Sequence, residues 1–110
     1  MLKPVLWLGD SRKAVRGFSR AGRRQSGQEL FRLQAGANPL DWKPMRPIRA
    51  GACEIRIHAG TEYRVIYVAK FAEAVYVLHA FTKKSQTTSL QDVRLAKQRY
   101  QDMEQARKKT

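Results

Sequence analysis

The feature that most constrains the fold is a run of three strand patterns, joined by short turns, in the second half of the chain. Residues 53–58 alternate apolar and polar side chains with the period of two of a half-buried strand. Residues 59–61 form a tight hairpin turn, and a second strand follows over residues 62–70. After a turn at residues 71–73, residues 74–81 are almost continuously apolar, which predicts a central strand covered on both faces. The short connections predict a three-stranded antiparallel meander.

Two helices are predicted before these strands. A short strand over residues 4–8 precedes a first helix over residues 11–18, where apolar residues recur at helical spacing. A longer helix is expected from about Arg20 to Ala35, with Ser19 as its cap. Helices joined this tightly are predicted to form an antiparallel hairpin. The expected apolar stripe of the second helix consists of Leu30, Phe31 and Leu33.

An irregular segment and a last helix complete the pattern. Three prolines between residues 38 and 51 disfavour a helix or a central strand there. Ser89, followed by Asp92, resembles a capping box, and apolar residues follow at helical spacing as far as Met103. The predicted order is β-α-α-β-β-β-α, an α+β fold in which an antiparallel sheet packs against an N-terminal helical hairpin and a C-terminal helix. One domain spanning residues 1–110 is expected.

The net charge limits the partners that such a domain can have. Its 22 Lys and Arg against 9 Asp and Glu give a formal charge of +13 and an isoelectric point near 10.6. Residues 1–50 contribute +8 (11 basic, 3 acidic) and residues 51–110 contribute +5 (11 basic, 6 acidic), so the excess covers the whole chain. We expect a polyanionic partner, which is nucleic acid, an anionic membrane surface or an acidic protein; the alternative is a merely soluble basic surface.

Several classes of function are excluded by what the sequence lacks. It has no glycine-rich phosphate loop, no nucleophile elbow and no group of residues at metal-ligand spacing, so we expect no metal and no cofactor. No apolar run approaches the roughly 20 residues that span a bilayer, so no membrane-spanning segment is expected. Among the possible polyanions, we do not expect a membrane to be the partner. The N-terminal apolar stretch is too short for a secretory signal, and Cys53 is a single cysteine. A reducing, cytoplasmic setting is expected.

Basic side chains gather around the predicted sheet. Arg56 and His58 lie two residues apart and share one strand face, and Arg64 follows the hairpin turn within reach of them. His79 lies late in the apolar strand, and Lys83-Lys84 come just beyond its end. If these groups converge, they supply the base, the cations and the acid with which RNA is cleaved by its own 2′-hydroxyl without a metal. Further residues expected to contact RNA are Arg46, Arg49 and Tyr63.

A structural interpretation remains open for each of these residues. Arg56 is explained equally well by an ion pair with Glu54 or Glu62 on an exposed strand. His79 lies within an apolar strand, where a histidine is more often a hydrogen-bonded core residue. His58 is close to the turn, and in the structural interpretation it is an ordinary surface residue.

Three segments of the chain carry a resemblance to a known family. They are DWKPMRPI at residues 41–48, EIRI at 54–57 followed by YRVIY at 63–67, and VLHAFTKKSQTT at 77–88. Together they resemble HigB-like toxins of the RelE/ParE superfamily, a branch often described as phage-derived, and the likeness extends from about Trp7 to Tyr100. The resemblance implies the RelE-like fold.

The resemblance also implies a function and a set of partners. RelE-like toxins of type II toxin–antitoxin modules cleave messenger RNA, typically in the ribosomal A site and without a metal, leaving a 2′,3′-cyclic phosphate and a 5′-hydroxyl. ParE-like members instead poison DNA gyrase. The partners implied are the ribosome, messenger RNA and a cognate helix-turn-helix antitoxin encoded by the adjacent gene, with operator DNA bound only through the antitoxin complex. A gyrase inhibitor and a non-catalytic RNA-binding protein remain the alternatives.

Basic positions that recur in the ribonucleases are matched here. They are an arginine on the strand after the hairpin turn, a basic residue shortly before the turn and a basic residue after the last strand. In this chain Arg64, Arg56 and Lys84 (or Lys83) stand at these positions.

One departure from the family pattern concerns proton transfer. The best-known ribonucleases carry a tyrosine shortly after the last strand, where this chain has the residues Thr88-Ser89-Leu90. The proton carrier is therefore sought among Tyr63, His79 and His58.

Overall fold

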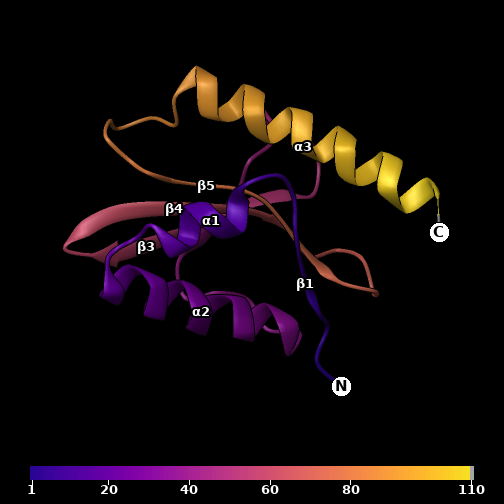
Figure 1. Ribbon diagram of the computed structural model, residues 1–110, viewed down its shortest axis with the longest axis horizontal. Helices are drawn as coiled ribbons and strands as arrows, with labels where there is room; N and C mark the ends of the chain where they lie inside the picture. Colours follow the sequence, from indigo (N-terminus) through magenta and orange to yellow (C-terminus); the bar gives the residue numbers. More distant parts are fainter. Residues whose placement is uncertain (110) are drawn as a thin grey trace.

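The computed structural model describes residues 1–109 and shows a five-stranded sheet with helices on both faces (Figure 1). The strands lie in the order β1-β5-β4-β3-β2. Thr110, the end of the expected domain, lies outside the described residues. The predicted α+β fold is confirmed. The elements are β1 (Val5–Trp7), α1 (Ser11–Arg16), α2 (Arg20–Gln34), β2 (Trp42–Pro44), β3 (Ala52–Ala59), β4 (Thr61–Val68), β5 (Val75–Thr82) and α3 (Leu90–Lys108).

The expected meander is present, and a strand lies at each edge of it. β3, β4 and β5 pair antiparallel, as the short turns predict. β1 adds to β5 in parallel, so the sheet is mostly rather than wholly antiparallel. β2 lies in the segment predicted to be irregular and pairs with β3. This position is at the sheet edge, where a proline such as Pro44 removes no ladder hydrogen bond.

Each face of the sheet has its own apolar core. Leu30 and Leu33 of α2 pack on one face, against the inward side chains of β3, β4 and β5. Tyr100 and Met103 of α3 pack on the other face. The predicted stripe of α2 is wrong at Phe31, which is 55% exposed, because successive helical residues point about 100° apart and Phe31 lies outside the buried arc.

A β-bulge in β5 decides where its histidine lies. Ile66 of β4 faces His79, but the next residue, Tyr67, faces Val77, so Leu78 is the additional residue. Residues opposite each other share a face of the sheet, and Ile66 belongs to the core under α3. His79 therefore lies on the α3 side. Regular alternation from Val77 would have placed it on the side of the helical hairpin.

The termini of the longer helices carry the predicted caps. The side-chain oxygen of Ser19 accepts a hydrogen bond from the Gly22 N–H of α2, and that of Ser89 accepts one from the Asp92 N–H of α3, both at 3.1 Å. Each cap satisfies a backbone donor that has no partner within its helix.

We expect opposite effects from alanine at the two glycines of α2. A Cβ at Gly22 would lie 2.6 Å from Cε2 of Tyr63. That ring cannot move away easily, because it stacks on Phe18 at 4.1 Å and its hydroxyl accepts the Ser19 N–H at 3.1 Å. Gly22→Ala should therefore lower the free energy of unfolding by about 1–3 kcal/mol in urea denaturation. At Gly27 a Cβ meets no described atom within 4 Å, so Gly27→Ala should raise the free energy of unfolding by up to about 1 kcal/mol. Equal effects would contradict the packing described.

Candidate functional site

Basic side chains from two strands and from the loop after β5 line one open hollow of about 440 Å³, which we call the basic hollow. Arg56 of β3 and Arg64 of β4 are directly opposite each other in the ladder. The N–H of Lys83 donates to the carbonyl of Glu62 at 2.8 Å, which ties the segment after β5 to the start of β4. The structure thus brings together four of the predicted residues. The residues that line the basic hollow are Arg56, Glu62, Arg64, Lys83, Lys84, Ser85 and Gln86.

A buried carboxylate lies beside the two arginines. Glu54 of β3 is 0% exposed, and its Oε1 is 3.6 Å from Nε of Arg64 and 4.0 Å from Nε of Arg56. Its Oε2 accepts a hydrogen bond from Oγ1 of Thr88 at 3.0 Å. The ion pair of Arg56 with Glu54, which the sequence left open, is therefore present. Sequence reasoning missed Glu54 as part of the site, although its place two residues before Arg56 in an alternating strand was a usable signal.

The guanidinium groups keep donors that no described side chain uses. Arg64 donates through Nη1 to Oε1 of Glu62 at 3.1 Å and to the carbonyl of Tyr63 at 2.9 Å. Its Nε and the Nε of Arg56 are buried and have no hydrogen-bond partner within residues 1–109. Arg64 is therefore held by two hydrogen bonds and by the charge of Glu54, and both arginines line a hollow that is open to an anion.

Lys83 has a pKa below its usual range. Burial removes water from its ammonium group, and the positive charge of Arg64 acts in the same direction, as do Lys43 and Arg56. Lys43 stands opposite Glu54 in the β2–β3 ladder and so shares the sheet face of the arginines, which the sequence did not reveal. A lysine with a lowered pKa releases its proton more readily than an ordinary one.

His58 is held between two carboxylates and does not line the basic hollow. Its Nε2 is 2.6 Å from Oδ2 of Asp41, and its Nδ1 is 2.7 Å from Oε2 of Glu62. The pKa of His58 is raised mainly by the hydrogen bond to Asp41 and, to a smaller extent, by the hydrogen bond to Glu62. Both ring nitrogens are therefore engaged by the protein itself.

His79 is also engaged. Its Nε2 is 2.7 Å from Oδ1 of Asp92 in α3, and its ring stacks on Phe81 at 5.2 Å. Nδ1 is buried and has no partner in the part of the chain that the structure describes. Phe81 and Asp92, with the two lysines, line a second hollow of about 140 Å³, but the imidazole lines neither hollow. The geometry fits a hydrogen-bonded core histidine.

The structure does not bring the three other predicted RNA contacts to the basic hollow. Tyr63 packs under Phe18 on the opposite face of the sheet. The guanidinium of Arg49 lies 5.3 Å over the ring of Tyr100 on the α3 side. Arg46 lines a separate hollow beside β2.

The segment that stands where the family has a tyrosine serves the structure. Thr88 holds the carboxylate of Glu54. Ser89 caps α3 and also donates its hydroxyl to Oδ2 of Asp92 at 2.6 Å. Leu90 is exposed. None of the three lines the basic hollow.

Two kinds of feature are absent from residues 1–109. No three His, Cys, Asp or Glu side chains are grouped so that they could hold a metal ion. None of the helices described has both the length and the apolar character needed to cross a membrane.

A known protein family matches most of the chain. The family model described as Phage derived protein Gp49-like (DUF891) matches residues 13–101. This range includes every residue that lines the basic hollow, together with Glu54. No curated protein matches the sequence.

We expect Glu54 to be needed for stability in a way that Glu62 is not. Glu54→Gln keeps the shape of the side chain but leaves the buried guanidinium of Arg64 with only the half-exposed Glu62 as a countercharge, which should lower the free energy of unfolding by about 3 kcal/mol. Glu62→Gln is the matched control, because Glu62 is 45% exposed and should change stability by less than about 1 kcal/mol. Urea denaturation at neutral pH measures both. An unchanged Glu54→Gln protein would contradict the buried ion pair.

Proposed function

Because the chain belongs to the Gp49-like family of phage-derived proteins, a RelE/Gp49-type toxin family, we propose that it is a HigB-like toxin that cleaves messenger RNA on the ribosome in the cytoplasm. The observation that carries this proposal is the convergence of Arg56, Arg64, Lys83 and Lys84 on one hollow. Four cationic groups on one small surface fit a phosphodiester and its flanking phosphates.

The reaction that suits this site is attack by the RNA on itself. The 2′-oxygen forms a bond to the neighbouring phosphorus, and the bond from phosphorus to the 5′-oxygen breaks. The 2′-hydroxyl loses its proton and the leaving 5′-oxygen gains one, so the products are a 2′,3′-cyclic phosphate and a 5′-hydroxyl. Negative charge develops on the phosphoryl oxygens, and preorganised cations stabilise it.

The lining residues divide these tasks among them. Arg56, Arg64 and Lys84 neutralise the phosphoryl oxygens, since all three present cationic groups to the hollow. Lys83 protonates the leaving 5′-oxygen, for which its lowered pKa suits it. Glu62 is the single carboxylate among the lining residues described, and we assign it the proton of the 2′-hydroxyl. Its hydrogen bonds to His58 and Arg64 lower its pKa, so one of them must break before Glu62 acts as the base. In this assignment the histidines keep structural roles, because neither lines the basic hollow.

Membership of a toxin family also implies an antitoxin partner. We propose that it is encoded by the adjacent gene, that it carries a helix-turn-helix domain and that operator DNA is bound through it. An acidic surface on the antitoxin would be drawn to a toxin of net charge +13.

Cleavage of transcripts on programmed ribosomes tests the proposal directly. The wild-type protein should give fragments with 2′,3′-cyclic phosphate and 5′-hydroxyl ends. Arg64→Lys keeps a countercharge for Glu54 but loses the planar fork, and should slow cleavage by about a hundredfold. Arg94→Lys, on the exposed side of α3, is the matched control and should cleave normally. Intact transcripts, or DNA damage signalling on expression without RNA cleavage, would contradict the ribonuclease and favour a gyrase inhibitor.

The two lysines after β5 should be needed for toxicity and not for folding. Lys83→Ala with Lys84→Ala removes two charges from a loop, with little loss of apolar contact, and should change the free energy of unfolding by less than about 1 kcal/mol. A well-placed donor to the transition state is worth roughly 2–4 kcal/mol. The double variant should fold normally and fail to arrest growth when expressed. If the variant remains toxic, neither lysine belongs to the catalytic site. If it unfolds, the lysines have a structural role.

A further inference from the structure

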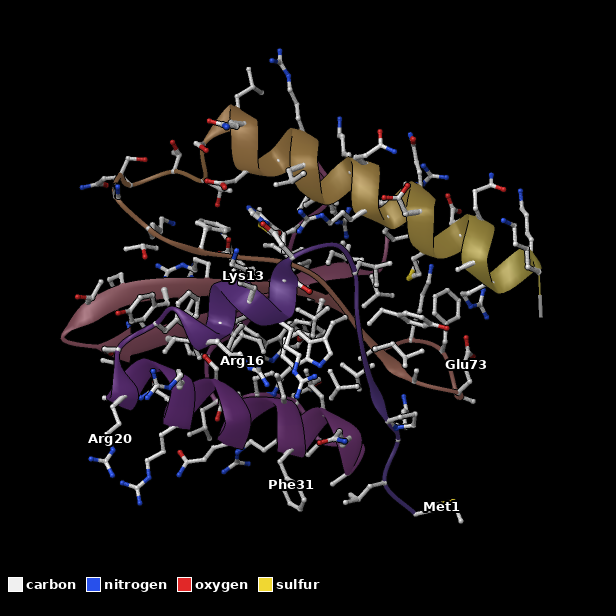
Figure 2. All side chains as sticks on the ribbon, in the orientation of Figure 1. Met1, Lys13, Arg16, Arg20, Phe31 and Glu73 are labelled. Atoms are coloured by element: carbon white, nitrogen blue, oxygen red, sulfur yellow. The ribbon has the colours of Figure 1, made fainter. Side chains whose placement is uncertain are left out.

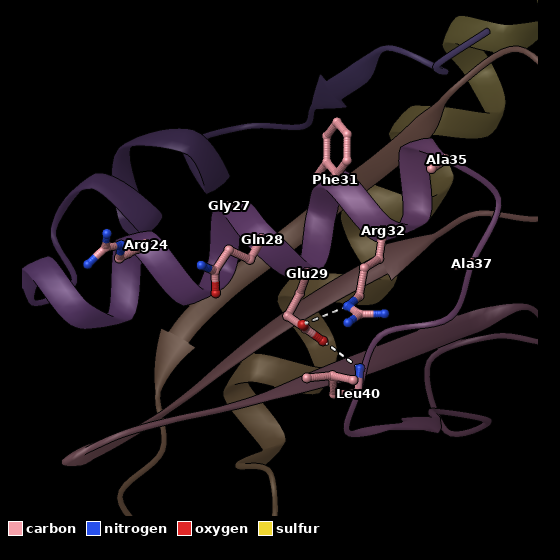
Figure 3. A pocket seen from close by; sticks show the side chains of 9 residues that line it. All are labelled: Arg24, Gly27, Gln28, Glu29, Phe31, Arg32, Ala35, Ala37 and Leu40. Atoms are coloured by element: carbon pink, nitrogen blue, oxygen red, sulfur yellow. Dashed lines mark hydrogen bonds and ion pairs between the residues drawn. The ribbon is translucent and has the colours of Figure 1, made fainter.

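An apolar hollow of about 900 Å³ lies along the outer side of α2, on the sheet face opposite α3 (Figure 3). Two large apolar side chains in its lining are exposed, Phe31 by 55% and Leu40 by 76%. Figure 2 shows Phe31 pointing away from the sheet into the surroundings. Gly27 lies one helical turn before Phe31 in α2 and leaves open space, since a Cβ there would meet no described atom within 4 Å. This surface, which we call the α2 hollow, has room for a ligand against apolar walls.

A buried carboxylate fixes the shape of the α2 hollow. Glu29 is only 5% exposed, and its Oε2 accepts the backbone N–H of Leu40 at 2.6 Å. Its Oε1 lies 3.6 Å from Nε of Arg32 (Figure 3). The segment after α2 is thereby tied to the helix at Leu40, whose side chain belongs to the lining and is exposed.

The charge around the α2 hollow has one sign. Arg24 and Arg32 belong to its lining, and Arg20 and Arg23 lie on the same helix. The single acidic residue in the lining is Glu29, and both of its oxygens are already engaged. An incoming surface must therefore offer apolar side chains flanked by negative charge.

We propose that the α2 hollow binds an acidic amphipathic helix of a partner protein. A helix in a groove places apolar side chains at positions i, i+3, i+4 and i+7 on one side, which suits the exposed phenylalanine and leucine. Glutamates or aspartates beside that stripe meet Arg24 and Arg32. A second copy of this chain is disfavoured because each copy carries +13, and the apolar walls offer RNA little beyond the arginines. The proposal does not depend on ribonuclease activity.

A designed peptide provides the probe. It is a fluorescein-labelled helix of about five turns with leucines along one side and glutamates flanking them, and its counterpart replaces every glutamate by lysine. Fluorescence anisotropy with the full-length protein should show the acidic peptide binding at least about tenfold more tightly than the lysine peptide. Phe31→Ser with Leu40→Ser should weaken binding about tenfold or more, and Arg24→Glu should weaken it also.

Matched controls exclude non-specific effects. Leu90→Ser removes a leucine that is 64% exposed at the start of α3, and Arg94→Glu reverses an exposed charge on the same helix; both should bind like wild type. The Phe31/Leu40 variant should keep the wild-type thermal unfolding curve and wild-type cleavage on ribosomes, so failure here is separable from failure of the proposed function.

Three outcomes would overturn the proposal. The first is that the acidic peptide fails to bind, or that Leu90→Ser weakens it as much as the Phe31/Leu40 variant does. The second is concentration-dependent self-association in sedimentation that the Phe31/Leu40 variant abolishes, which would assign the hollow to a second copy. The third is displacement of the peptide by single-stranded RNA whose own binding is lost in the same variant.

Discussion

The ion pair of the buried Glu54 with Arg56 and Arg64 is the interaction on which the end of the sheet and the basic hollow both depend. A carboxylate with no exposure is tolerated only where nearby charges and donors replace its lost hydration. Two guanidinium groups and the hydroxyl of Thr88 do so, and these partners come from β3, β4 and the segment before α3. The contact that stabilises this region therefore also holds both arginines in the wall of the hollow. Under the proposed function, Glu54 therefore contributes both to folding and to phosphate recognition.

The sheet separates two surfaces that share one sign of charge. α3 and the basic hollow belong to the face of Ile66 and Arg64, whereas α2 and its hollow belong to the face of Val65. Arginines line both hollows and lysines line the basic hollow as well, but exposed apolar side chains accompany the charges only at α2. The basic hollow therefore fits a hydrated polyanion, and the α2 hollow fits an acidic surface with an apolar stripe. Because the sheet lies between them, occupation of one does not exclude occupation of the other.

The sequence predicts the parts of this arrangement that depend on neighbouring residues, and it does not predict the parts that depend on contacts between distant residues. Alternation over residues 53–58 and 62–68 assigns Arg56 and Arg64 to one face, since the period of a strand is two and the hairpin turn between them is short. The position of His79 depends on a bulge, which alternation alone does not reveal. Glu54 resembles an ordinary strand charge in the sequence, because its buried carboxylate is held by Thr88, which is distant in the chain. The capture of His58 by Asp41 likewise depends on a long-range contact through β2.

The cationic groups of the basic hollow are held together at an electrostatic cost, and the lowered pKa of Lys83 is the sign of it. Burial and the charges of Arg64, Lys43 and Arg56 all disfavour its protonated form, while Glu54 is the one group that favours it. A phosphate in the hollow adds negative charge at this point and so relieves the repulsion, which strengthens the hold of the site on its ligand. Under the proposed function, the like charges that repel one another in the empty hollow therefore favour binding of the phosphate.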